Sequence, residues 1–418
     1  MFTHPRTPEE AAPIEPTRLD ASGRKAGATH TDSRVLAIDA GRGFAMLFVG
    51  ISHIGLYIQD DSAPLAYVLH WLGFFAAPNF LLLSGISCGY QLAVSPSRDT
   101  VTRIVDRGLF VLLVGHVLIA GSVMYNVPPG TAFEHIIITD TIGLVLCTTP
   151  FVAHLRVRQL LLGGAALFLL TALVGLTWHP TSPPAQLVGG LLLGLDSPIA
   201  HDPGLMSPTL AYFALFLAGI GIGRLICQYR SEGREAIIAT RLLGVGLGAA
   251  AFALFANLVA YHMSEAFSLH LTHERWVNML VNLSVIRHQR PPTPAYALCY
   301  GGIGVALVGL LLFASRQQLS AVVVGPVRAV AVLGRASFVS YVCIQWLIDF
   351  TPHGLGFSEA LTPALALAYL GLVILVVFGV AWVWDAKRGN RLLTVGLKPG
   401  HGRPRSKPTR PASAPRWL

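Results

Sequence analysis

The stretch RVLAIDAGRGFAMLFVGISH, residues 34–53, decides the fold, because charged residues run directly into a hydrophobic segment of membrane length. Asp39 and Arg42 lie near its start, and His53 lies at its end. An ionisable group inside a membrane-spanning helix is costly, so each of the three is a candidate functional residue. At about 100° per residue they share one narrow stripe of a helix, and Arg42 and His53 are roughly 16 Å apart along its axis. We therefore expect this stripe to face protein or a water-filled cavity and not lipid.

The composition is that of an integral membrane protein. Of the 418 residues, 53% are hydrophobic and only 12% are charged. Hydrophobic runs recur along the chain and predict about ten transmembrane helices. Their predicted ranges are 35–58, 65–93, 104–124, 135–153, 158–177, 208–227, 239–261, 295–314, 327–349 and 361–383. We expect an all-α fold, a polytopic helix bundle, because helices satisfy their own backbone hydrogen bonds in lipid.

The net charge of +9 reflects membrane topology and does not indicate nucleic-acid binding. Arg and Lys concentrate in the N-terminal arm, in alternate connections between the predicted helices and in the C-terminal tail. This distribution follows the positive-inside rule and predicts that both termini are cytoplasmic. We therefore expect a multi-pass protein of the cell (inner or plasma) membrane, with the lipid bilayer and no nucleic acid among its partners.

Three regions are expected along the chain. Residues 1–33 are polar and read as a disordered cytoplasmic arm, and residues 34–384 form the transmembrane domain. Residues 385–418 form a basic, Pro-rich cytoplasmic tail, which should be largely disordered.

Further polar candidates lie in the second and third predicted helices. Asn79 is interesting because a buried amide needs partners or a ligand. Arg103 and Arg107 are neighbours at positions i and i+4, and guanidinium groups bind phosphates bidentately. The alternative for both arginines is a plain topological anchor. His116, midway through the same helix, is a secondary polar candidate.

The longest predicted outer connection, residues 262–294, carries several histidines together with Trp276. His273 and Trp276 could belong to a platform for a sugar-like acceptor, and a solvated loop is the alternative. The histidine spacing matches no zinc pattern, so we expect no metal site.

The pattern R-x4-D-x2-RG-x9-H in residues 34–53 resembles the opening of the transmembrane acyltransferases. This group contains heparan-α-glucosaminide N-acetyltransferase-like proteins, the acyltransferase-3 family and the glucan succinyltransferases. Further segments that match in order are APNFLLLSG (77–85), SPTLAYFALFLAGIGIGRL (207–225), RPPTPAYAL (290–298) and LGRASFVSYVCIQWLI (333–348). The resemblance covers roughly residues 34–384, and the RPPTPAYAL element points towards the heparan-α-glucosaminide N-acetyltransferase-like branch.

The resemblance implies a membrane-bound acyltransferase that performs O- or N-acyl transfer. The co-substrate would be acetyl-coenzyme A or another acyl-coenzyme A used from the cytoplasmic side, with no tightly bound cofactor. The acyl group would pass to a hydroxyl or amine at the outer side, on a carbohydrate or lipid-linked acceptor.

Carried onto this chain, the resemblance and the residue chemistry give each candidate a role. His53 would be the general base, and Asp39 would fix Arg42. Arg42, Arg103 and Arg107 would hold the donor's phosphates, while Asn79, His273 and Trp276 are candidate acceptor residues. A transporter or permease that uses the same stripe as a substrate or proton path is the competing class. The oligomeric state is open, with a homodimer as one alternative.

Overall fold

The computed structural model describes residues 35–58, 64–124, 132–133, 136–195, 207–268, 281–287, 292–316, 321–354, 356 and 361–397. In these ranges the regular secondary structure is helical, and one isolated bridge joins Ile58 to Leu361. The prediction of an all-α fold is therefore confirmed. The helices are α1 Leu36–Ile54, η1 Gly55–Tyr57, α2 Pro64–Gly73, α3 Ala76–Val94, α4 Arg98–Phe110, η2 Val111–Gly115, α5 His116–Val123, α7 Ile138–Cys147, α8 Thr149–Val152, α9 Val157–Thr177, α10 Pro183–Leu193, α11 Thr209–Ser231, α12 Glu235–Ser268, α14 Pro294–Tyr296, η4 Ala297–Gly301, α15 Gly302–Arg316, α16 Ala321–Arg335, α17 Ser337–Gln345, η5 Trp346–Phe350, α18 Thr351–Gly354, α19 Pro363–Ala386 and η6 Gly389–Leu392.

The number of helices that could cross a membrane is lower than predicted. Among the described residues, seven helices are long and apolar enough, and an eighth is reached if a bent pair forms one span. The seven are Pro64–Val94, Arg98–Val123, Val157–Thr177, Thr209–Ser231, Glu235–His262, Pro294–Ser315 and Pro363–Ala386. The bent pair is Gly325–Arg335 with Ser337–Phe350, which meet at 80°. The chain is thus a multi-pass membrane protein, and the part of the chain that the structure describes holds fewer candidate spans than the ten predicted.

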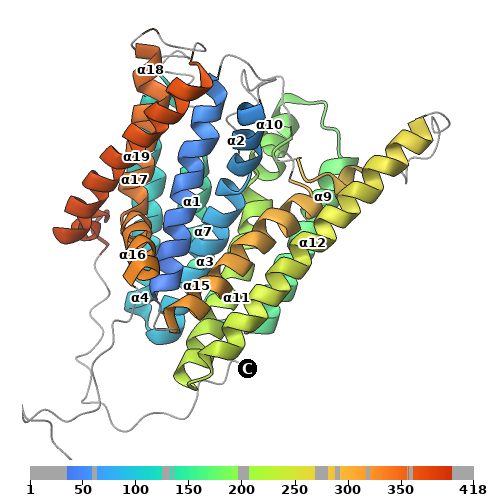
Figure 1. Cartoon of the computed structure of the whole chain (residues 1–418). Helices are drawn as coiled ribbons and strands as arrows, with labels where there is room; N and C mark the ends of the chain where they lie inside the picture. The colour runs from blue at the N-terminus through green and yellow to red at the C-terminus, as the bar shows by residue number, and fades with distance from the viewer. Residues whose placement is uncertain are drawn as a thin grey trace, which may run out of the picture. The chain divides into compact units, whose positions relative to one another are not determined.

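The first predicted span, residues 35–58, is one of the two predicted spans that are absent from the seven helices and the bent pair. It forms α1, a helix of 19 residues that includes Asp39 and Arg42. With these charged residues, α1 is less apolar than the seven helices named above. The helix packs instead against α2, α3, α15, α16, α17 and α19. Figure 1 shows α1 in blue between α3 and the orange and red helices of the C-terminal part. A helix enclosed by other helices can carry charge that a lipid-facing helix cannot.

The predicted span 135–153 is the second one that is absent from the seven helices and the bent pair. It forms α7, of 10 residues, followed by the four-residue α8, and α7 spans only about 15 Å at 1.5 Å per residue. Such a segment does not cross the roughly 30 Å hydrocarbon core by itself. The similarly short apolar helix α10 was not predicted at all.

Glycines bring the backbones of α1 and α16 into direct contact. A Cβ atom on Gly43 would lie 1.9 Å from the carbonyl oxygen of Val330, and one on Gly334 would lie 1.8 Å from that of Asp39. Side chains cannot occupy such space, so both positions require glycine. Small residues at helix crossings allow this close approach in membranes. The contact places the start of α1 against the end of α16, next to the bend into α17.

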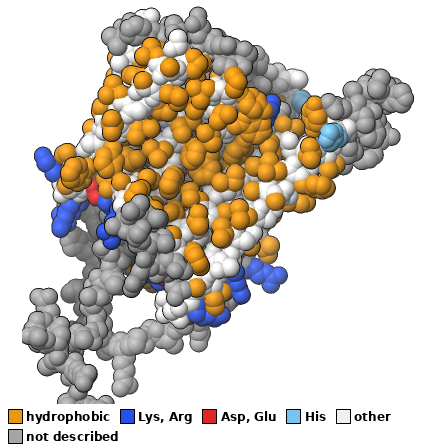
Figure 2. All heavy atoms as spheres, in the orientation of Figure 1, with side chains coloured by type: hydrophobic (Ala, Val, Ile, Leu, Met, Phe, Trp, Pro, Cys, Tyr) orange, Lys and Arg blue, Asp and Glu red, His pale blue; other side chains and the backbone are white. Residues whose placement is uncertain are grey.

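Much of the exposed apolar surface lies on α12 and α19. Large hydrophobic side chains lie exposed on both helices, for example Phe255 at 64% and Leu375 at 70%. Figure 2 shows hydrophobic side chains covering this face, with Lys and Arg gathered along its lower margin. This separation of apolar and basic surface is the one expected of a protein held in a bilayer with its cations at the interface.

The close contact between α1 and α16 predicts that replacing Gly43 by alanine destabilises the fold. Gly43→Ala forces a Cβ into the backbone of Val330, and overpacking of this kind costs about 1–3 kcal/mol. We expect a lower thermal denaturation temperature in detergent and less folded protein by size-exclusion chromatography. Gly244→Ala is the matched control, because nothing lies within 4 Å of a Cβ at that glycine of α12. Equal losses of stability in the two variants would contradict the close crossing.

Candidate functional site

Arg42 is tied to the first residue of α17. Its guanidinium Nη2 donates to the hydroxyl of Ser337, which is buried. Asp39, one turn earlier on α1, is half-buried, and its carbonyl packs against Gly334. The sequence predicted that Asp39 and Arg42 share one stripe of the helix. In the structure these two residues contact Gly334 and Ser337, which lie on either side of the bend between α16 and α17.

His53 is tied to the far end of the same C-terminal segment. Its Nδ1 lies 3.1 Å from Oδ1 of Asp349, in the π-helical turn η5. The Tyr57 hydroxyl donates to the same carboxylate oxygen at 3.4 Å. The side chain of His53 is 26% exposed and that of Asp349 is 9% exposed. A carboxylate accepts hydrogen bonds, so Nδ1 carries the proton and Nε2 keeps the lone pair that a general base needs.

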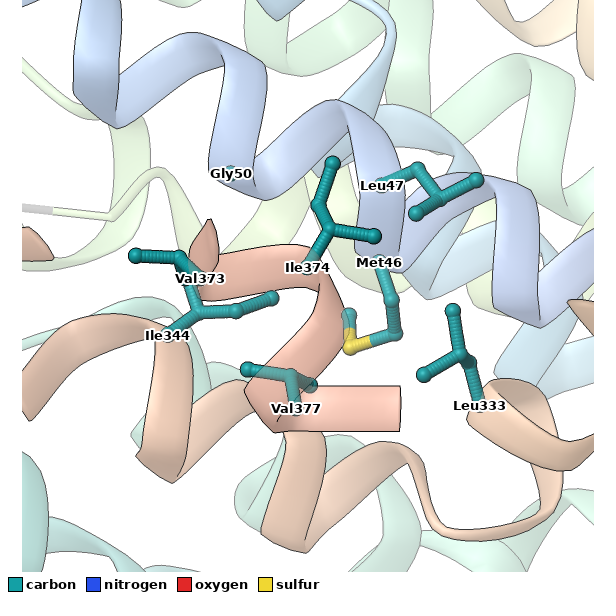
Figure 3. A pocket seen from close by; sticks show the side chains of 8 residues that line it. All are labelled: Met46, Leu47, Gly50, Leu333, Ile344, Val373, Ile374 and Val377. Atoms are coloured by element: carbon teal, nitrogen blue, oxygen red, sulfur yellow. The ribbon is translucent and has the colours of Figure 1, made fainter. Parts of the chain in front are cut away.

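The middle of the stripe is apolar and closed by protein. A hollow of about 270 Å³, part of it open space, lies between α1, the end of α16, α17 and α19. Figure 3 shows the side chains that line it: Met46, Leu47, Gly50, Leu333, Ile344, Val373, Ile374 and Val377. Met46 and Gly50 lie on the stripe between its two polar ends, which confirms that the stripe faces protein.

Arg103 and Arg107 are exposed on α4, and Arg103 Nη2 donates to the Thr100 hydroxyl at 3.1 Å. The same helix ends at Phe110, whose ring centroid lies 5.5 Å from that of Phe338. Phe338 directly follows Ser337, the partner of Arg42. The three arginines named from the sequence therefore lie on two helices that meet the start of α17.

Asn79 is a structural link between helices. It is completely buried, and its Nδ2 donates to the carbonyls of Phe75 at 2.7 Å and Tyr300 at 2.9 Å. A Cβ on Gly304 would come within 1.4 Å of its Oδ1, so the amide fills the space that this glycine leaves. These contacts link α3 to η4, while the buried Oδ1 of Asn79 has no hydrogen-bond partner among the described residues, and a role in acceptor binding stays a prediction. The other two acceptor candidates, His273 and Trp276, lie outside the described residues.

His116 also has an acidic partner that the sequence did not reveal. Its Nδ1 lies 2.9 Å from Oδ2 of Asp140, and its Nε2 lies 3.1 Å from the carbonyl oxygen of Phe133. The same Asp140 oxygen accepts from the backbone N–H of Ile137 at 2.9 Å, at the start of α7. Both ring nitrogens of His116 lie within hydrogen-bond distance of oxygen atoms, and the contact with Asp140 links α5 to α7.

Three side-chain partners of the candidate residues were missed from sequence: Asp349, Ser337 and Asp140. The segment quoted for its family resemblance ends at Ile348, one residue before Asp349. An acid within the apolar run VCIQWLIDF, residues 342–350, was the available signal, because such groups are rare in membrane helices and usually functional. Among the described residues, no group of three or more His, Cys, Asp and Glu side chains is placed to hold a metal ion.

The comparisons with known proteins point to one family. A family model described as heparan-alpha-glucosaminide N-acetyltransferase, catalytic, matches residues 34–246, just over half of the 418 residues. The match includes both polar ends of the α1 stripe and the whole of α4. A search of curated proteins found no match. The chain therefore belongs to the heparan-alpha-glucosaminide N-acetyltransferase family of membrane acetyltransferases, which use acetyl-coenzyme A as the donor.

Proposed function

We propose that this protein moves an acetyl group from cytoplasmic acetyl-coenzyme A to an amine or hydroxyl of a carbohydrate at the outer side of the cell membrane. The observation that carries the proposal is the His53–Asp349 pair at one end of α1, with arginines at the other end. Family membership supports acetyl transfer over the transporter alternative. Sidedness is supported by the distribution of Lys and Arg along the chain.

The His53–Asp349 pair can perform the proton transfer that acyl transfer needs. As the acceptor nitrogen or oxygen attacks the thioester carbonyl, Nε2 of His53 takes its proton. The new C–N or C–O bond forms, the C–S bond breaks, and the proton returns from His53 to the thiolate of coenzyme A. Asp349 fixes the imidazole and stabilises the imidazolium, the role of the carboxylate in a Ser-His-Asp triad. We prefer this direct transfer to an acyl-histidine intermediate.

The arginines fit the donor's phosphates. Arg103 and Arg107 are exposed on α4, and Arg42 lies at the neighbouring start of α17 through its bond to Ser337. The distance of roughly 16 Å along α1 from Arg42 to His53 leaves length for the pantetheine arm. The arm would follow the apolar side of α1 and would have to widen the small hollow beside Met46.

The first prediction concerns His53. His53→Ala should lower kcat by about 10²–10⁴-fold, the usual contribution of a general base. Binding of acetyl-coenzyme A by calorimetry should remain, since the proposed phosphate contacts lie at the other end of α1. His154→Ala, at an exposed histidine in the turn before α9, is the matched control and should keep parental turnover. A folded His53→Ala protein with turnover within threefold of the parent would end this assignment.

The second prediction concerns Asp349 as a positioning residue. Asp349→Asn should reduce kcat by about 10²-fold or more, because the equivalent change in a catalytic triad costs about 10⁴-fold. The KM for acetyl-coenzyme A should stay unchanged, and Asp349→Glu should recover part of the rate. A purely structural aspartate would instead show a loss of thermal stability with an unaltered kcat in the protein that remains folded.

The third prediction concerns the donor site. Each of Arg103→Ala and Arg107→Ala removes a charge-assisted phosphate contact, worth about 1.5–3 kcal/mol. The KM for acetyl-coenzyme A should rise at least tenfold per arginine, with kcat at saturating donor nearly constant. Arg158→Ala, an exposed arginine at the start of α9, controls for the loss of surface charge. Unchanged donor affinity in the Arg103/Arg107 double variant would make both residues topological anchors.

A further inference from the structure

The segment that follows α19 fastens to the bend between α16 and α17. We call residues 389–397 the strap. Nδ2 of Asn390 donates to the Arg335 carbonyl at 2.8 Å, and Nε1 of Trp384 donates to Oδ1 of Asn390 at 3.1 Å. The Arg335 guanidinium in turn donates to Asp385 at 2.8 Å. The start of the strap is therefore fixed to Arg335, which lies two residues before Ser337, the partner of Arg42.

The end of the strap fastens to α4. Oδ1 of Asp106 accepts the backbone N–H groups of Val395 at 3.2 Å and Leu397 at 2.9 Å. Gly396 lies between them with φ +88°, a left-handed conformation that glycine adopts easily. Successive backbone N–H groups that converge in this way form an anion-binding concavity. Its anion is the Asp106 carboxylate, which is buried.

Asp106 is a buried residue of α4 that lies, in sequence, between two exposed arginines. It lies three residues after Arg103 and directly before Arg107. Side chains at i and i+3 are neighbours on a helix, so a carboxylate here would pair with the Arg103 guanidinium and weaken its hold on phosphate. In the structure Arg103 Nη2 bonds to the Thr100 hydroxyl, and Asp106 is held by the strap.

We propose that the strap sequesters the Asp106 carboxylate, so that it does not compete with the phosphates of the donor for the Arg103 guanidinium. Asp106 and the strap amides are positioning elements that act through the arginines. This inference rests on the proposed function, because it requires that Arg103 and Arg107 hold acetyl-coenzyme A. It makes donor affinity depend on residues near the end of the chain, far in sequence from α4.

The test removes three strap donors to Asp106, the backbone N–H groups of residues 395 and 397 and the Thr394 hydroxyl, and leaves the carboxylate in place. Proline has no backbone N–H and alanine has no hydroxyl, so the full-length variant Thr394→Ala/Val395→Pro/Leu397→Pro loses these three hydrogen bonds. The KM for acetyl-coenzyme A should rise about two- to fivefold, the effect of one exposed ion pair, with kcat nearly unchanged. The matched control is Thr394→Ala/Val395→Ala/Leu397→Ala, which changes the same side chains and keeps both N–H groups. A KM for the proline variant equal to that of this control overturns the proposal.

A rescue separates sequestration from simple support of the fold. Adding Asp106→Asn to the proline variant removes the competing charge, so its KM should return to within about twofold of the parent. A strap that only supports the fold predicts no such recovery, and that outcome overturns the proposal. Asp106→Asn alone keeps an oxygen that can accept the strap N–H groups and should leave KM at or below the parental value. A raised KM in this single variant also overturns the proposal, even if the proline variant does not fold.

Failure of this inference can be told apart from failure of the proposed function. Calorimetric binding of coenzyme A to the full-length Arg103→Ala/Arg107→Ala variant tests the donor site itself. Parental affinity in that variant refutes the donor site and this inference together. Weakened binding there, with parental KM in the proline variant, refutes the role of the strap alone.

Discussion

The structure depends on partners for the ionisable groups of α1. Asp39, Arg42 and His53 lie on a helix enclosed by other helices, where an uncompensated charge is costly. One segment, α17 with η5, provides a partner at each end: Ser337 for Arg42 and Asp349 for His53. The 80° bend that precedes α17 turns this segment along α1. The glycine contact between α1 and α16 fixes where that bend lies.

The apolar middle of the stripe separates the two polar ends. Met46 is completely buried, and the hollow beside it is lined by aliphatic side chains, Met46 and Gly50. A thioester that reached His53 past such a barrier would meet little water from the donor side. Exclusion of water suppresses hydrolysis and strengthens the electrostatic contact between His53 and Asp349. The same packing explains why a polar stripe can exist in a bilayer protein without forming an open channel.

Local periodicity was enough to predict the stripe, because positions 39, 42 and 53 share one side of any α-helix. The partners could not be predicted in the same way. Asp349 lies 296 residues from His53, and only the packing of α17 beside α1 brings the two together. Asn79 shows the opposite difficulty, since a buried amide predicts a need for partners but does not say whether these are a ligand or backbone carbonyls.

The error in the number of spans has a physical origin as well. Hydropathy measures how well a segment suits lipid, whereas α1 is surrounded by other helices of the protein. The helix α7, with 10 residues, is too short to cross the hydrocarbon core of a bilayer. The seven helices that meet the length and composition test include α12 and α19, whose exposed leucines and phenylalanines face outward. Hydrophobic runs therefore predicted the long apolar helices well, both the exposed α12 and α19 and the more buried α3 and α11, and did not distinguish α1 and α7 from them.

The separation of 295 residues between Arg42 and Ser337 also bears on how the protein is made. At a synthesis rate of about 5–20 residues per second, α1 emerges roughly 15–60 s before α17 exists. During that interval Arg42 and His53 lack Ser337 and Asp349, although the helix must already enter or lie against the membrane. The nascent chain thus needs a temporary shelter for α1, from the insertion machinery or from α2 and α3. The proposed site is complete only when the C-terminal helices have been inserted beside α1.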